Sequence, residues 1–364
     1  MYEITGYDHY GRGITKINDK ICFVDNTLIG DVVELKITND KKNYSEAIVT
    51  KYIKKNDKHC ESVCKYYAVC GGCNILHMPY EEQLSFKHNK ITNIIAKYVS
   101  KDIKINDIVP SNIQFHYRNK VTLHKKNNII GYYNKNSNDI IKIDECLLLN
   151  DLINKEIKKI DGYHLVIRTN GQDIINDNNQ DLLCQIGDYK YNISLNSFYQ
   201  INDNVTKKLY DKIKEYANLT KKEIVYDLYC GAGTIGIYLA NEAKYVYGIE
   251  INEEAILNAN KNKEINNIHN IEFISGSCSD NILAFKDKPD VIIVDPPRAG
   301  LDSNTIKEII NLNPQKIIYT SCDPMTLARD LKILSDKYSI IEITPFDMFP
   351  NTYHVECVVL LVKK

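Results

Sequence analysis

The sequence lacks any apolar run long enough to cross a membrane, although 44% of its 364 residues are apolar. The N-terminal stretch MYEITGYDHYGRG has no apolar segment of the kind that a secretory signal requires. We therefore expect a cytoplasmic protein with no membrane partner. The eleven cysteines should then be reduced thiols, cluster or metal ligands, or a nucleophile, rather than disulfides.

The chain also has little net charge, −1, because 46 Lys and Arg face 47 Asp and Glu. The charges are unevenly distributed, since residues 81–135 carry ten basic against four acidic side chains. A basic belt on a near-neutral protein suits an anionic partner such as nucleic acid, although a solvated surface has the same composition. Nothing in the composition indicates an obligate protein partner.

Three segments with different patterns predict the domain organisation. Residues 1–57 alternate short β-branched runs with turn residues, which predicts a small β-barrel of the kind often used to hold oligonucleotides. Residues 58–195 are mixed, with an expected helix near 80–99 and several strand-like runs. Residues 196–364 alternate strands and helices, which predicts an α/β domain with a doubly wound, mainly parallel sheet.

A glycine-rich turn follows the strand-like run EIVYDLYC, where Gly231, Gly233 and Gly236 form G-x-G-x-x-G. Such glycines let the backbone approach a ligand at a helix N-terminus, and a nicotinamide cofactor fits this pattern as well. Glu250 ends the next strand, where it is placed to hold ribose hydroxyls. The D-P-P-R run that begins at Asp295 favours S-adenosylmethionine, whose enzymes commonly place such a loop beside the methyl acceptor.

The stretch SCDPMTLARDL, residues 321–331, puts Cys322 between a strand-like run and a helix-like run. Asp323 and Pro324 suit the start of that helix. Open α/β sheets bind their ligands at the carboxyl ends of their strands, where this turn is expected. From the residues alone, Cys322 is a core filler, a metal ligand or a nucleophile.

Four motifs together carry a family resemblance: DLYCGAGTIG, DPPRAGL, YTSCDP and HVECVVLL. They occur in this order in the S-adenosylmethionine-dependent RNA uracil-5-methyltransferases, which the sequence resembles over essentially its whole length. The N-terminal GRGITKI and GDVVELKITNDKKNYSEAIV resemble the TRAM RNA-binding barrel of many members. The resemblance implies a Rossmann-like class I methyltransferase domain, a TRAM/OB-like barrel and a mixed α+β central domain. It implies methylation of C5 of a uridine in RNA, and 23S ribosomal RNA is expected rather than transfer RNA.

The same resemblance assigns the catalytic residues, with Cys322 as the nucleophile and Glu356 as the general base. It implies contacts to S-adenosylmethionine from Gln200 in FYQIN, Tyr229, Glu250 and Asp295, beside the turn residues Gly231 and Gly233.

The chemistry of C5 methylation calls for such groups. A thiolate that adds to C6 of uracil activates C5, and a carboxylate must later remove the C5 proton. Amides at the helix start and Arg298 are expected to favour the thiolate of Cys322. Burial is expected to raise the pKa of Glu356.

The run KHCESVCKYYAVCGGCNI places Cys60, Cys64, Cys70 and Cys73 within fourteen residues. Alone, these four suit tetrahedral zinc. The resemblance instead selects Cys64, Cys70, Cys73 and the distant Cys146 as ligands of a [4Fe–4S] cluster, which leaves Cys60 as an extra. Spacing does not separate the two metals, and we expect the cluster, in a structural role, with zinc as the alternative. The cysteines expected to be ordinary buried thiols are Cys22, Cys184, Cys230, Cys278 and Cys357.

Other functions remain as alternatives. An RNA 5-methylcytosine methyltransferase usually carries a cysteine directly after the two prolines, where Arg298 stands here. A catalytically silent RNA-binding protein would have no use for Cys322, Glu356 and Asp295 together. A nicotinamide-dependent oxidoreductase with an iron–sulfur centre does not account for D-P-P-R and S-C-D-P. The candidates for RNA contact, or for packing within the central domain, are His116, Tyr117, Arg118 and Lys120 in FHYRNK.

Overall fold

The computed structural model describes residues 1–160, 162, 165–177 and 180–364, and it divides into two compact units. The first unit consists of Met1–Lys90, His124–Ile143 and Phe349–Tyr353. The second unit consists of Ile91–Leu123, Asp144–Met348 and His354–Lys364. The predicted domain boundaries after residues 57 and 195 stay a prediction.

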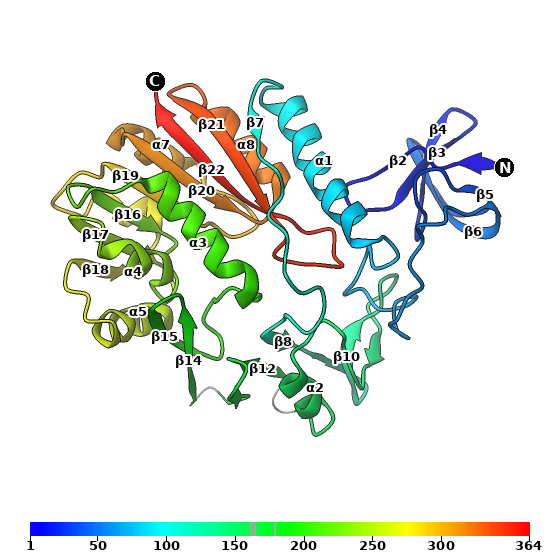
Figure 1. Ribbon diagram of the computed structural model, residues 1–364, viewed down its shortest axis with the longest axis horizontal. Coiled ribbons are helices and arrows are strands. Elements are labelled where there is room, and N and C mark those ends of the chain that lie inside the picture. Colours follow the sequence, from blue (N-terminus) through cyan, green and yellow to red (C-terminus); the bar gives the residue numbers. More distant parts are fainter. Residues whose placement is uncertain (161, 163–164, 178–179) are drawn as a thin grey trace. The chain divides into compact units, whose positions relative to one another are not determined.

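The N-terminal strands of the first unit (blue in Figure 1) are β1 Tyr2–Glu3, β2 Gly6–Tyr7, β3 Gly13–Ile17, β4 Lys20–Val24, β5 Val32–Asp40 and β6 Tyr44–Lys54. They form one sheet in the order β1-β5-β6-β4-β3-β2, in which only β4 and β6 pair in parallel. Asn18 and Asp19 join β3 to β4 with φ values of 50° and 62°, the positive values that a type I′ hairpin turn requires. Ile4, Val24 and Val33 are fully buried between the strands. The predicted small all-β N-terminal domain is confirmed.

The remainder of the first unit packs beside this sheet and contains the cysteine segment, defined as residues 58–79. Its elements are the start of helix α1 Tyr80–Tyr98 and the strands β9 His124–Lys126, β10 Ile129–Tyr133 and β11 Ile140–Lys142. A small apolar cluster joins Leu28 of the barrel to Ile75, Met78 and Phe86, so the barrel and the cysteine segment share a core.

The second unit is built on an eight-stranded sheet with the order β18-β17-β16-β19-β20-β22-β21-β7. Its strands are β7 Lys104–Ile105, β16 Ile224–Leu228, β17 Tyr245–Glu250, β18 Ile271–Ser275, β19 Val291–Val294, β20 Lys316–Ser321, β21 Tyr338–Phe346 and β22 Glu356–Lys363. Only β22 runs antiparallel to its neighbours. The strand order reverses between β16 and β19, and open α/β sheets bind ligands at the carboxyl end of such a point.

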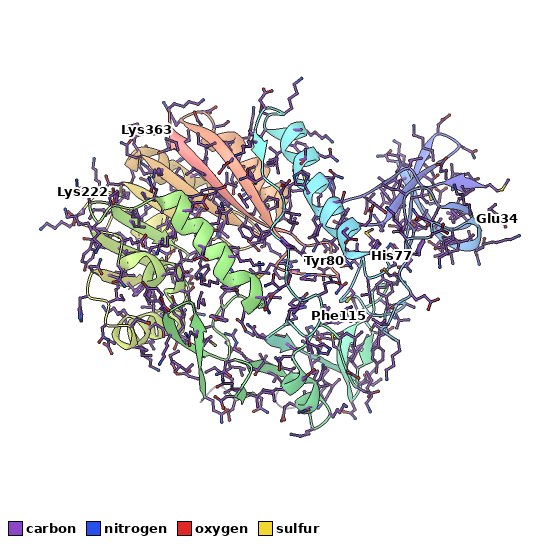
Figure 2. All side chains as sticks on the ribbon, viewed as in Figure 1. Glu34, His77, Tyr80, Phe115, Lys222 and Lys363 are labelled. Carbon is purple, nitrogen blue, oxygen red and sulfur yellow. The ribbon has the colours of Figure 1, made fainter. Side chains whose placement is uncertain are left out.

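Helices cover both faces of this sheet (Figure 1). They are α3 Asp203–Ala217, α4 Thr234–Ala240, α5 Glu253–Ile265, α6 Cys278–Asn281, α7 Ser303–Leu312 and α8 Pro324–Leu334. Side chains of α1, α7 and α8 share one apolar core with alternate residues of the central strands, such as Leu228, Val294 and Tyr319. The predicted doubly wound, mainly parallel sheet is confirmed. Lys222 and Lys363, labelled in Figure 2, are exposed at the edge where β16 begins and β22 ends.

The remaining elements are β8 Lys120–Thr122, α2 Asp151–Ile157, β12 Val166–Thr169, β13 Ile174–Ile175, β14 Asp181–Ile186 and β15 Tyr189–Ser194. They make a three-stranded sheet β13-β12-β8 and a hairpin β14-β15. No helix in the described part of the chain is long and apolar enough to cross a membrane.

Candidate active site

The glycine-rich turn leaves β16 sharply at the carboxyl edge of the sheet. Tyr229, Gly231 and Gly233 have φ values of 63°, 55° and 74°, in the left-handed region. A Cβ atom on Gly233 would lie 2.5 Å from the ring of Phe273, so glycine is required there for space as well as for conformation. The turn therefore places backbone at the carboxyl end of β16, next to the point where the strand order reverses.

Glu250 is held at the end of β17 by this turn. Its Oε2 accepts a hydrogen bond from the Gly231 amide at 3.1 Å, and its Oε1 accepts one from the Asn252 amide at 2.9 Å. Each oxygen keeps a further acceptor site, so the carboxylate is fixed in place and still able to receive ribose hydroxyls.

Asp227 forms the buried floor of the turn. Its Oδ2 accepts the Gly236 amide at 2.8 Å, which ties the start of α4 to β16. Its Oδ1 has no hydrogen-bond partner among the described residues. Burial raises the pKa of Asp227 to about 7, and the charges of Asp295 and Glu250 add to the effect.

Strand pairing brings Cys322 and Glu356 together. Ser321 at the end of β20 pairs with Cys357 of β22, so the next residues outward on the two strands are Cys322 and Glu356. Asp295 follows β19, which pairs in parallel with β20, and so lies at the same edge. Glu356 is only 3% exposed, whereas Cys322 and Asp295 are half-buried. Residues predicted from three separate motifs thus form one group.

The electrostatics of this group follow from burial and from like charges. Burial raises the pKa of Cys322 to about 12, with the Glu356 and Asp295 charges adding and Arg298 opposing. Burial raises the pKa of Glu356 well above its ordinary range, as expected, and Asp295 raises it further. Burial also raises the pKa of Asp295 to about 7. Two neighbouring carboxyls, one buried and one half-buried, resist carrying two charges, so near neutral pH the pair retains a proton.

The expected stabilisation of the thiolate by the helix start is not what the structure has. Asp323 caps α8, and its Oδ1 accepts the amides of Met325 and Thr326 at 2.9 and 3.0 Å. The capping carboxylate therefore occupies the donors that were expected to stabilise the sulfur, and its own charge further raises the pKa of Cys322. Arg298 does act in the expected direction, since it lowers this pKa.

Helix α8 also holds the loop that begins with D-P-P-R and contains Arg298, through hydrogen bonds to its backbone. Buried Asp330 accepts the Leu301 amide at 2.8 Å and the Tyr319 hydroxyl at 2.7 Å. Arg329 donates to the carbonyls of Ala299 and Leu301 at 2.9 and 3.0 Å. Sequence reasoning missed both residues, although a charged pair in an otherwise amphipathic helix was the available signal.

Gln200 is buried, and its backbone carbonyl accepts a hydrogen bond from the side-chain amide of Asn119 at 2.9 Å. The FHYRNK and FYQIN segments therefore meet within the second unit, where Arg118 bridges to Asn202. Arg168, which sequence reasoning missed, is 1% exposed, and its Nε and Nη1 have no partner among the described residues.

Lys120 pairs with Arg168 across β8 and β12. Burial and the charge of Arg168 lower the pKa of Lys120 to about 8. Two adjacent cations thus lie beside the segment that contains Gln200, which agrees with the expected contact between FHYRNK and an anionic ligand and equally with packing.

Comparison with known proteins assigns the fold. Residues 155–364 match the tRNA (Uracil-5-)-methyltransferase family, and residues 3–50 match the TRAM domain. The chain belongs to this methyltransferase family. It is an S-adenosylmethionine-dependent RNA (uracil-5-)-methyltransferase, as the sequence motifs predict.

Relatives cover nearly the whole enzyme. An uncharacterized RNA methyltransferase of Staphylococcus epidermidis is 34% identical over 98% of this chain and 95% of its own. One of Clostridium acetobutylicum is 35% identical over the same shares. The crystal structure of the Pyrococcus abyssi tRNA (uracil-54, C5)-methyltransferase in complex with S-adenosyl-L-homocysteine is 29% identical, covers 100% of both chains and has a TM-score of 0.75.

None of the eleven cysteines of the methyltransferase forms a disulfide. The five expected to be inert are buried, Cys60 is exposed, and the four expected cluster ligands are half-buried. Cys70 already accepts a hydrogen bond from the Gly72 amide at 3.4 Å. Reduced, accessible thiols are the donor type that a cluster needs. Among the residues that the structure describes, however, no three His, Cys, Asp or Glu side chains are arranged to hold a metal ion.

Proposed function

We propose that this enzyme methylates C5 of a uridine through a covalent bond between Cys322 and C6 of the base. The observation that carries the proposal is the grouping of Cys322, Glu356 and Asp295 at the carboxyl ends of β19, β20 and β22. This group lies at the same edge of the sheet as the glycine-rich turn and Glu250, next to the reversal of strand order.

The proposed sequence of bonds uses each member of the group. Cys322 Sγ adds to C6 while a carboxylate of the pair accepts the thiol proton, which leaves an enolate with charge on O4 and C5. When bound, S-adenosylmethionine supplies the electrophilic methyl group. Glu356, as a carboxylate, then removes the proton from C5, and the Sγ–C6 bond breaks to restore the uracil ring.

The proposed cofactor contacts lie at the carboxyl edge of the sheet, around the reversal of strand order. Glu250 holds the ribose hydroxyls, and Tyr229, Gly231 and Gly233 let the cofactor approach the backbone. Two further cofactor contacts are proposed. Asp295 would contribute from the end of β19, and Gln200 would contribute from the FYQIN segment. Calorimetric binding of S-adenosylmethionine should weaken strongly in Glu250→Ala and remain unchanged in Cys322→Ala.

RNA that contains 5-fluorouracil tests the covalent step. Fluorine at C5 does not leave as a proton, so the adduct should persist with the wild-type enzyme and resist denaturation. Cys322→Ala should form none, and Cys60→Ala, which removes an exposed thiol, should form as much as the wild type. An adduct with Cys322→Ala, or none with the wild type in the presence of cofactor, would refute the mechanism.

We propose ribosomal RNA, and 23S in particular, as the substrate, because the four-cysteine pattern resembles the ribosomal branch of the family. Transfer RNA is a second candidate, supported by the name of the matching family and by the Pyrococcus abyssi structure. Mapping 5-methyluridine in cells with and without the gene separates them. Loss confined to transfer RNA would overturn the ribosomal proposal, and no loss in either RNA would count against both.

We also propose that Cys64, Cys70, Cys73 and Cys146 hold a structural [4Fe–4S] cluster, with zinc as the alternative. The support is the cysteine pattern and the reduced, half-buried state of these thiols. No step of the reaction depends on it. Enzyme purified without oxygen should contain about four iron atoms per chain and absorb broadly in the visible. Cys70→Ser should lose the iron and Cys60→Ser should keep it, whereas stoichiometric zinc without iron would sink the cluster assignment.

A further inference from the structure

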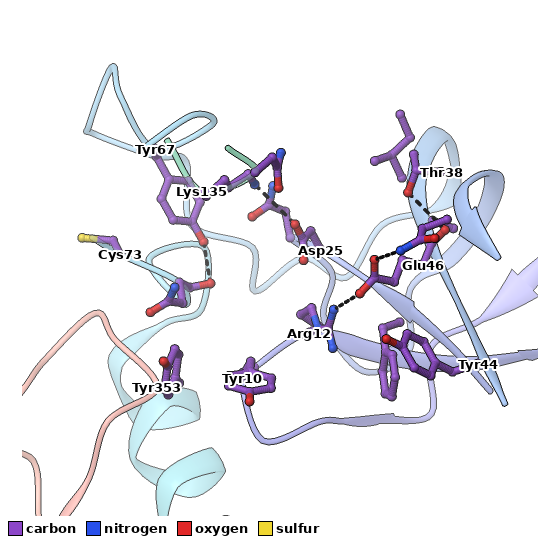
Figure 3. Close-up of a pocket in the computed structure, with 18 residues that line it drawn as sticks. Tyr10, Arg12, Asp25, Thr38, Tyr44, Glu46, Tyr67, Cys73, Lys135 and Tyr353 are labelled. Atoms are coloured by element: carbon purple, nitrogen blue, oxygen red, sulfur yellow. Dashed lines mark hydrogen bonds and ion pairs between the residues drawn. The ribbon is translucent and has the colours of Figure 1, made fainter. Parts of the chain in front are cut away.

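The first unit contains a cavity of about 960 Å³ that the catalytic reaction does not use (Figure 3). Residues of the N-terminal barrel line it, together with residues of the cysteine segment, of the turn after β10 and of the segment Phe349–Tyr353. Binding pockets for small molecules usually span about 300–1,000 Å³, so this cavity has room for more than one flat ring.

Aromatic rings form the walls of the cavity. Tyr10 is 55% exposed and meets Tyr353 edge to face, with 5.2 Å between the ring centroids. Phe23 and Tyr44 form a second tilted pair at 5.5 Å. Tyr10, Phe23 and Tyr44 lie outside the buried clusters of the first unit, whereas Tyr353 also packs against the cluster that contains Phe86. Exposed aromatic faces are the platform on which proteins stack the bases of single strands.

Arg12 connects the two aromatic pairs. Its guanidinium lies 4.5 Å from the centroid of the Phe23 ring and 5.6 Å from that of Tyr10. Asp8 accepts from its Nε at 2.7 Å and Glu46 accepts from its Nη1 at 2.9 Å. The guanidinium is thereby locked in orientation and neutralised, which leaves it as a flat surface rather than a free charge.

The charges that line the cavity cancel. The cationic lining residues are Arg12 and Lys135, and the anionic ones are Asp25 and Glu46. Arg12 pairs with Glu46, and Lys135 approaches Asp25 at 3.4 Å. The cavity has no excess positive charge to bind a phosphate. An uncharged aromatic ring can bind without such a charge.

Unused amides supply hydrogen-bonding groups. The lining includes Asn26, Asn74 and Asn136, whose side-chain amides make no hydrogen bond within the described part of the chain. An amide offers a donor and an acceptor side by side, which is the pattern that nucleobase edges complement. The aromatic walls, the paired charges and the available asparagine amides are together the features expected of a site that binds a nucleobase.

We propose that this cavity binds an unstacked base of the substrate RNA, at a site separate from the catalytic group. The proposal rests on the proposed function only in taking RNA as the substrate. The site would hold single-stranded or looped RNA by its bases, while lysines elsewhere contact phosphates. Its contribution to affinity should therefore be insensitive to salt.

Binding of a fluorescently labelled single-stranded RNA to the full chain, measured by anisotropy at several salt concentrations, tests this. Tyr10→Ala and Tyr44→Ala should each bind about 5- to 150-fold more weakly, with an unchanged dependence of affinity on salt. Tyr10→Phe should keep wild-type affinity because it keeps the ring. Tyr98→Ala, a control at the end of α1 that is 42% exposed and outside the cavity lining, should change nothing.

An oligonucleotide with abasic sites keeps its phosphates and lacks the bases. Tyr10→Ala and the wild type should therefore bind this strand with equal affinity. Wild-type affinity in both alanine variants would overturn the proposal. A loss that persists on the abasic strand, or that reduces the salt dependence, would also overturn it, because it would indicate contact with the phosphates. The 5-fluorouracil adduct separates this site from catalysis: at saturating RNA, Tyr10→Ala should still form it. If the wild type forms none and Tyr10→Ala still binds RNA weakly, the proposed mechanism fails and the base site stands.

Discussion

Cys322 should be a slow nucleophile in the enzyme without RNA, and Glu356→Gln should make it faster. Burial and two neighbouring carboxyls raise the pKa of this thiol to about 12. At pH 8 about one part in ten thousand would then be thiolate, against about a quarter for an ordinary thiol with a pKa of about 8.5. The more basic thiolate is intrinsically the stronger nucleophile, which raises its rate of alkylation by a factor of about 40. Alkylation of Cys322 should therefore be about 60-fold slower than that of an ordinary exposed thiol.

Where the carboxyl pair is fully ionised, Glu356→Gln removes the largest of the charges that oppose the thiolate. A like charge at contact distance shifts a pKa by about 1–3 units, so alkylation should accelerate about 3- to 30-fold at a pH high enough to ionise both carboxyls, and by less where the pair retains its proton. Methylation by the same variant should fall, because the base for the C5 proton is gone. Opposite changes in thiol reactivity and in turnover are not expected of a merely structural glutamate.

The assay is timed alkylation with iodoacetamide, followed by mass spectrometry of the peptide that contains Cys322. Exposed Cys60 in the same sample serves as the internal standard. Glu272→Gln, which neutralises an exposed carboxylate in β18 of the same sheet, is the matched control and should leave the rate unchanged. Labelling of Cys322 as fast as Cys60, or no acceleration in Glu356→Gln, would refute the reasoning.

Three further changes have defined outcomes. Gly233→Ala places a methyl group 2.5 Å from Phe273 at a positive φ, so it should lower the melting temperature and abolish calorimetric binding of S-adenosylmethionine. Asp227 has a folded-state pKa of about 7, above its unfolded value of about 3.9, so its ionisation destabilises the fold increasingly as pH rises from about 4 to 7. Asp227→Asn should therefore raise the melting temperature at pH 8, with a gain that shrinks toward pH 4. Asp330→Asn weakens the hold on Leu301 and Tyr319, so it should cost about 1–3 kcal/mol in denaturant unfolding and reduce turnover more than cofactor binding.

Local sequence signals were enough to predict the architecture of the second unit and the positions of its motifs. The alternation of β-branched runs with helical periods predicts β16 to β22, and the glycines predict the turn because positive φ has few other solutions. Residues that follow parallel strands lie at one edge of the sheet, which places Cys322 and Asp295 at the same edge. Antiparallel β22 brings Glu356 there through its register with β20.

Features that depend on distant contacts were not predictable. Arg168 occupies a strand in which most neighbours are apolar, and only its pairing with Lys120 reveals a buried cation beside a half-buried one. The cavity of the first unit needs Tyr10 and Tyr353, which lie at opposite ends of the chain. No periodicity or motif relates such residues, because the contact is created by packing alone.

The SCDP turn shows how one residue can serve two opposed roles. The sequence predicts that the amides at the start of α8 stabilise the thiolate of Cys322. In the structure, the carboxylate of Asp323 accepts these amides instead. The fold thus keeps Cys322 protonated, and the carboxyl pair of Glu356 and Asp295 beside it shares a proton near neutral pH. We infer that bound substrates must change this balance, because the sulfonium of the cofactor brings a positive charge to the carboxyl pair. Formation of the nucleophile then depends on occupancy of the site, and a free enzyme carries little thiolate to react with other electrophiles.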